Sequence, residues 1–261
     1  MRRFHTSLAF FGSMLFSIFL GAGQAQSENL VTSLSTHRVE ITSSYVGAQL
    51  VIFGSIERDG RTIARGDPYD LVIMVRGPRK THIIREKEMA GPIWINRTQR
   101  RFIDVPSFAA VASNRPLDMI LDKQQRIQQR IGLENILFPP PIGFDLDAGE
   151  AAFRDALIRI GSNDGLFSEL PLGVTFLSNT LFRAPITLPG ISPPGSYDVE
   201  VILMAGSVPL SRQSTNFEVV TIGIDQRIKL VSQRASFTYG LTTIMLALFF
   251  GWFASVIFRR D

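Results

Sequence analysis

A long run of uncharged residues near the C-terminus constrains this chain more than any other feature of its sequence. Residues 235–258 contain no charged side chain, and a helix of that length, at ~1.5 Å per residue, reaches across about 30 Å of hydrocarbon. Arg259 and Arg260 follow directly, and basic residues mark the cytoplasmic end of a span. We therefore predict a transmembrane helix over 235–258 and a cytoplasmic tail over 259–261.

The N-terminus has the pattern of a secretory signal. Arg2 and Arg3 precede an apolar stretch over 8–20, and small residues lead up to Ala25. This pattern predicts a signal peptide over 1–25, with an uncleaved anchor as the alternative. The two segments together predict a single-pass protein of the inner (plasma) membrane. Its N-terminal domain would be periplasmic, its C-terminus cytoplasmic, and the lipid bilayer its first partner.

The charge of the chain belongs mostly to these two segments. The formal net charge is +4, and without Arg2, Arg3, Arg259, Arg260 and Asp261 the chain keeps 23 basic and 22 acidic residues. A nearly neutral exported region argues against nucleic acid as a partner. The chain contains no cysteine, which excludes disulfide scaffolds, thiol nucleophiles and cysteine-type metal sites.

The region between the two segments alternates between strand-like and helix-like periodicity. Residues 26–116 and 166–222 show period-2 runs separated by turn residues. These runs predict a strand over Leu181–Leu188, a pair of strands over Tyr69–Val75 and Thr81–Arg85, and a hairpin turn at Asp59-Gly60. Residues 117–165 have apolar residues at helical spacing, which predicts one helix from Leu117 to Ile131 and a second after the proline run at 139–141. We predict a mainly β fold, an immunoglobulin-like sandwich-type ectodomain with an inserted helical pair, followed by a juxtamembrane segment over 223–234 and the transmembrane helix. Whether the two β regions form one sandwich or two lobes stays open.

No catalytic motif accompanies these elements. The sequence has no nucleophile elbow, phosphate loop or dinucleotide-binding glycine pattern. His37 and His82 are 45 residues apart, and a metal site would still need carboxylates from the fold. Glu86, Glu88 and Asp104 are candidates for an acid–base pair, although carboxylates spaced this way on strands more often face solvent. We expect no catalytic residue, no metal, no cofactor and no enzymatic activity.

Two features remain as candidate contact surfaces. A tryptophan such as Trp94 is more often part of a core than of a binding surface. Trp94 lies between Ile93 and Ile95, however, and strand alternation would turn it to the opposite face, where an exposed aromatic side chain would mark a binding surface. In the predicted transmembrane helix, small residues recur every fourth position and form one face that would let another helix approach closely. These residues are Thr243, Ala247, Gly251 and Ser255.

Several segments in one order resemble a known family. They include 37–41, 91–96, 106–112, 153–160, 181–186, 195–197, Tyr239-Gly240 and Gly251-Trp252. They are similar to an alphaproteobacterial family of single-pass transmembrane proteins that has no assigned activity, so the resemblance transfers no functional residue. It implies a membrane location and points to a permease of the sulfite-exporter type as a partner.

These observations predict a non-enzymatic accessory or assembly subunit of an inner-membrane complex, with a transporter as the partner. The partner would be another inner-membrane protein, such as a permease, or a second copy of the chain. The alternative is a tethered periplasmic solute- or metal-binding module, which requires Trp94, His37 and His82 to converge with carboxylates. A periplasmic hydrolase that uses carboxylates is the third hypothesis.

Overall fold

The computed structural model describes residues 28–42, 47–57, 68–139, 148–222 and 236–257. The predicted signal peptide, juxtamembrane segment and cytoplasmic tail, and the Asp59-Gly60 turn signal, lie outside these residues. The prediction of a mainly β chain is confirmed. The strands are β1 (Asn29–Leu34), β2 (Arg38–Thr42), β3 (Ala48–Glu57), β4 (Asp70–Arg76), β5 (Arg79–Ala90), β6 (Ile93–Pro106), β7 (Ala109–Ser113), β8 (Phe167–Pro171), β9 (Thr175–Phe176), β10 (Leu181–Leu188), β11 (Gly195–Ala205) and β12 (Val208–Ile222).

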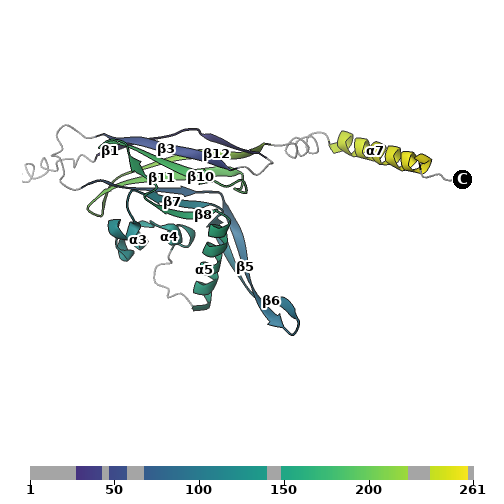
Figure 1. Ribbon diagram of the computed structural model, residues 1–261, viewed down its shortest axis with the longest axis horizontal. Coiled ribbons are helices and arrows are strands. Elements are labelled where there is room, and N and C mark those ends of the chain that lie inside the picture. Colours follow the sequence, from purple (N-terminus) through teal and green to yellow (C-terminus); the bar gives the residue numbers. More distant parts are fainter. Residues whose placement is uncertain (1–27, 43–46, 58–67, 140–147, 223–235, 258–261) are drawn as a thin grey trace, which may run out of the picture.

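Ten of these strands form two sheets that pack face to face (Figure 1). One sheet has the order β1-β3-β10-β9 and the other the order β2-β12-β11-β4-β7-β8. All pairs are antiparallel except β2 with β12 and β7 with β8. In an immunoglobulin-like sandwich, one sheet has the strand order A-B-E-D and the other contains G-F-C. The order β1-β3-β10-β9 corresponds to A-B-E-D, and β12-β11-β4 corresponds to G-F-C. Both β regions of the sequence therefore belong to one sandwich.

Alternation along the strands explains the core between the sheets. In β10, the side chains of Phe182, Ala184, Ile186 and Leu188 are buried and their neighbours are more exposed, as expected for a strand with one face inward. β4 is buried along almost its whole length because both faces of its sheet are covered. Its continuous run of apolar residues from Leu71 to Val75 is the sequence signature of such a strand.

Helices cover part of the outer face of the six-stranded sheet (Figure 1). Where one helix was predicted from Leu117 to Ile131, the chain forms α2 (Leu117–Ile120), α3 (Lys123–Gln129) and α4 (Leu133–Leu137). The prediction of a helical pair is therefore wrong. Asp122 starts α3 with a capping box, its carboxylate accepting from the Gln125 amide at 2.7 Å. The fourth helix, α5 (Ala148–Asn163), lies where the second of the pair was expected.

Left-handed backbone separates α3 from α4. Arg130 ends α3 with φ 57°, and Gly132, with φ 103°, precedes α4. Such values interrupt a helix, and glycine adopts them without steric cost. The apolar spacing of the sequence is preserved, however, because Leu117, Ile120 and Ile131 all reach the core beneath the helices.

The C-terminal helix α7 (Ser236–Ile257) corrects the prediction of a transmembrane span over 235–258. Within the described residues, no helix combines the length and the apolar character that crossing a membrane requires. Polar Ser236, Thr238, Thr242 and Thr243 occupy its first turns, so its mainly apolar run starts only at residue 244.

A tyrosine anchors the start of β11 in the core. Tyr197 is fully buried, stacks on Phe217 with ring centroids 5.1 Å apart, and donates its hydroxyl to the Pro193 carbonyl at 2.7 Å. Burial raises the pKa of the Tyr197 phenol above its ordinary value, so the hydroxyl remains a donor. A tyrosine bonded to the backbone a few residues upstream is a hallmark of immunoglobulin-like sandwiches.

We expect Tyr197→Phe to lower the free energy of unfolding by about 1 kcal/mol, because the Pro193 carbonyl loses its donor while the ring keeps its packing. Urea unfolding followed by circular dichroism measures this change. An unchanged midpoint of urea unfolding would show that the Tyr197 hydroxyl adds nothing to the stability of the sandwich.

Candidate functional site

A long hairpin projects from the sandwich and carries the exposed aromatic candidate (Figure 1). Among the strands that the structure describes, β5 and β6 pair only with each other, and they lie between β4 and β7 in the chain. Phe102 and Val105 are buried at the base of the hairpin, and the ring centroids of Phe102 and Phe138 are 5.2 Å apart. All side chains from Ile93 to Arg101 are exposed, so most of β6 stands outside the core.

The tip of this hairpin is apolar on both of its faces. Trp94 is 63% exposed and pairs across the strands with Met89, while Ile93 pairs with Ala90. Since successive side chains of a strand point to opposite faces, Trp94 and Met89 lie on one face, and Ile93 and Ile95 on the other. Gly91 closes the turn with φ 64°, a conformation that suits glycine.

The helix α7 carries the small-residue candidates. Thr243, Ala247, Gly251 and Ser255 are all exposed, and a Cβ added at Gly251 would meet no described atom within 4 Å. The large apolar residues around the helix are exposed as well, among them Leu246, Leu248, Phe249, Trp252 and Phe253. Figure 1 shows α7 apart from the two sheets.

The two histidines do not meet. His37 precedes β2 at the edge of the six-stranded sheet, where its carbonyl accepts from the Glu218 amide at 2.9 Å. His82 lies in β5 opposite Phe102, at the base of the hairpin, and Trp94 lies at the far end. Burial and the nearby Lys80 ammonium lower the pKa of His82. The described residues contain no group of three His, Asp or Glu side chains that could hold a metal ion.

The candidate carboxylates are engaged separately. Glu88 pairs with Arg97 at 2.8 Å, and Asp104 pairs with Arg79 at 2.9 Å. Glu86 is exposed farther along β5, so these groups share no cleft that the described residues form. The convergence of Trp94, the histidines and carboxylates that a tethered binding module requires is not found.

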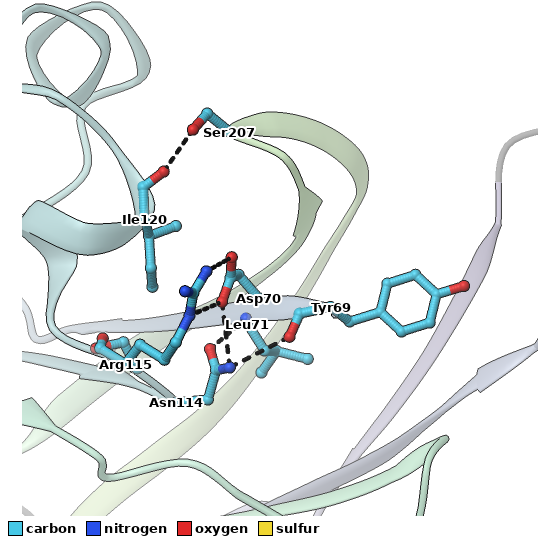
Figure 2. A network of polar contacts seen from close by, with 8 residues as sticks. Tyr69, Asp70, Leu71, Asn114, Arg115, Ile120 and Ser207 are labelled. Atoms are coloured by element: carbon cyan, nitrogen blue, oxygen red, sulfur yellow. Dashed lines mark hydrogen bonds and ion pairs between the residues drawn. The ribbon is translucent and has the colours of Figure 1, made fainter. Parts of the chain in front are cut away.

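A partly buried polar cluster joins the start of β4 to the residues that follow β7, beside the helical layer (Figure 2). Asp70, only 2% exposed, receives two hydrogen bonds from Arg115, one of them from Nε at 2.7 Å. Asn114 accepts from the Leu71 amide at 2.8 Å and donates to the Tyr69 carbonyl at 3.2 Å. The side chains of Asp70, Asn114 and Arg115 are joined to one another and to the backbone of β4, which indicates a structural role for the cluster.

This cluster was not among the predicted site residues. A charged residue directly before the apolar run of β4 was the available signal, because an aspartate beside a strand buried on both faces needs a partner. Its partner is 45 residues away in the chain, so no local pattern could identify it. The hydrogen bond with Asp70 raises the pKa of the Arg115 guanidinium.

The fold and its exposed elements define an immunoglobulin-like β-sandwich protein with a helical layer, a projecting hairpin and an exposed apolar helix. The family described as "Putative transmembrane protein" (Alph_Pro_TM) matches residues 29–260. The chain belongs to this family of membrane proteins, which is alphaproteobacterial by its name. No curated protein matches the chain.

Proposed function

We propose that the protein is a non-enzymatic accessory or assembly subunit of an inner-membrane complex, with a transporter as the partner. The exposed helix α7 carries this proposal. Large apolar side chains that are exposed together mark a site of contact with another molecule. The large apolar side chains described for α7 belong to neither core cluster of the sandwich, which supports a second molecule as their cover.

The small residues of α7 support a helix as the covering element. Gly251 lies at the centre of the face formed with Thr243, Ala247 and Ser255, and no described atom approaches it. Small residues at such positions let two helix backbones pack closely, with gains from van der Waals contact. We assign this face to a helix of a membrane-embedded partner, with a second copy of the chain as the competing occupant.

The sandwich would lie on the periplasmic side of the inner membrane. The family description supports the membrane part of this proposal. The basic residues, apolar stretch and small residues of 1–25 support export of the domain. Among the described residues, the scattered histidines and separately paired carboxylates favour a contact role over a solute- or metal-binding one.

Affinity purification of the full chain from membranes solubilised in mild detergent tests the proposal. We expect a stoichiometric membrane protein to be recovered, and Gly251→Leu to reduce its recovery roughly tenfold because the leucine holds the two helices apart. Thr242→Leu is the matched control, since this position lies on the opposite side of the helix. Repeated recovery of the chain alone would overturn the proposal, and an unchanged yield with Gly251→Leu would remove the small-residue face from it.

A further inference from the structure

We propose that the tip of the β5–β6 hairpin enters the headgroup layer of a lipid surface that carries negative charge. The first ground is the reach of the hairpin. From His82, beside the buried base, to Met89 at the tip, β5 extends for about 24 Å. A two-stranded ribbon of this length is marginally stable in water on its own, so an apolar tip at its end calls for a binding partner.

The second ground is the distribution of apolar side chains at the tip. The stretch from Met89 to Ile95 contains no charged residue. Its side chains are exposed on both faces of the ribbon, with Trp94 on one and Ile93 on the other. A protein groove typically covers one face of a strand pair, whereas a lipid layer surrounds an inserted tip on all sides. Tryptophan, in addition, is enriched where membrane and water meet.

The third ground is the charge behind the tip. The charged residues between the apolar tip and the base are five cations, Arg85, Lys87, Arg97, Arg100 and Arg101, and two anions, Glu86 and Glu88. Arg97 is paired with Glu88, so the net charge of this part of the hairpin is positive. Lys87 lies about 7 Å and Arg85 about 13 Å from Met89 along β5. The polar layer on each side of a bilayer is about 5–7 Å thick. With the tip at the inner boundary of this layer, Lys87 reaches the headgroups and the other cations face the charged surface, which attracts basic side chains.

The backbone sets the depth of insertion. The outer edges of a two-stranded ribbon keep unpaired N–H and C=O groups, which cannot enter hydrocarbon without a large penalty. The hairpin would therefore stop at the level of the headgroups. This contact goes beyond the proposed function and does not depend on it, because it needs lipid and no protein partner.

The experiment uses Trp94 as a fluorescent reporter. The chain contains two tryptophans, so Trp252→Phe in the full chain leaves Trp94 alone. This protein is mixed with phosphatidylcholine vesicles that either contain or lack phosphatidylglycerol. With phosphatidylglycerol, we expect a blue-shifted emission, loss of quenching by aqueous iodide, and quenching by lipids brominated near the headgroups.

Two pairs of variants separate the contribution of the positive charges from that of the apolar tip. In the Trp252→Phe protein, the double substitution Lys87→Glu and Arg100→Glu should weaken the phosphatidylglycerol-dependent protection of Trp94 from iodide roughly tenfold or more. Arg159→Glu with Arg183→Glu makes the same charge change on α5 and β10 and should not. Ile93→Ser should return Trp94 toward water, whereas Ile103→Ser, at another exposed isoleucine of β6, should not. All these positions are exposed, and equal melting midpoints verify the fold.

Equal iodide quenching with and without phosphatidylglycerol vesicles would overturn the inference. Shielding that appears only when a membrane protein is added would overturn it in favour of a protein partner. If a stoichiometric complex is recovered while Trp94 stays in water, the proposed function stands and this inference fails. If Trp94 is shielded by lipid while the chain is recovered alone, the reverse holds.

Discussion

Gly54→Ala should lower the free energy of unfolding by about 3 kcal/mol, since the added methyl group has no space between two strands and a ring. A Cβ at this position would lie 2.3 Å from the Val31 carbonyl oxygen in β1 and 2.7 Å from Cζ of Phe182 in β10. The ring can turn aside, but the carbonyl belongs to the β1–β3 ladder and moves only with its strand. For a domain of this size, the melting midpoint should fall by roughly 6–12 °C.

Ser55→Ala is the matched control in the neighbouring position of β3. Its side chain is half-buried, and removing the hydroxyl should change the free energy of unfolding by no more than about 0.5 kcal/mol. Adding Phe182→Leu to Gly54→Ala should not restore stability, because the contact with the Val31 carbonyl remains. A Gly54→Ala protein as stable as the original would mean that β1 can shift away from β3.

Arg115→Met should lower the free energy of unfolding by about 2–3 kcal/mol. The substitution leaves the carboxylate of Asp70 buried, with only the Asn114 side chain, 3.3 Å away, as a hydrogen-bond donor in Figure 2. Breaking a fully buried ion pair costs about 3–5 kcal/mol. Arg115 itself is 42% exposed, so water reaches its site and reduces the cost. Urea unfolding at neutral pH measures the loss.

Arg212→Met provides the comparison for this second prediction. Arg212 is 40% exposed and also pairs with a carboxylate, that of Glu200, but Glu200 keeps Arg76 at 2.8 Å as a second partner. Its replacement should cost no more than about 0.5 kcal/mol. Adding Asp70→Leu to Arg115→Met should recover about 1 kcal/mol because no buried charge is left. Equal losses for Arg115→Met and Arg212→Met would contradict the importance of burial at Asp70.

Strands with strict alternation are the part of the fold that the sequence predicts best. Leu181–Leu188 is found as β10 with the predicted bounds, since every second residue is apolar and Pro189-Gly190 follows. The predicted helix from Leu117 fails because apolar spacing does not report the cap at Asp122 or the left-handed backbone at Arg130. Pairing is not local either: β4 was expected beside β5 but pairs with β7 and β11.

The candidate site was only partly accessible to sequence reasoning. Alternation offered exposure of Trp94 as an alternative to a core position, but on the premise that Ile93 and Ile95 face the core, whereas all three side chains are exposed. The projection of the hairpin could not be anticipated, because its strands read as ordinary half-buried strands until their partners are known. The uncharged run over 235–258 led to a wrong prediction. Its lack of charge suggested a full membrane span, although polar residues occur in the first turns of α7. Its small-residue face remains a prediction.

The parallel pairing of β2 with β12 has a mechanical consequence. Arg38 to Thr42 lie beside Glu218 to Ile222, and the chain continues from Ile222 toward α7. Tension between the sandwich and whatever holds α7 would act along the axis of β12. The hydrogen bonds to β2 run across this direction, so they would share the load and break together instead of opening one by one. A pull from the C-terminal end would therefore load the β2–β12 pair in shear, the direction in which paired strands resist separation most.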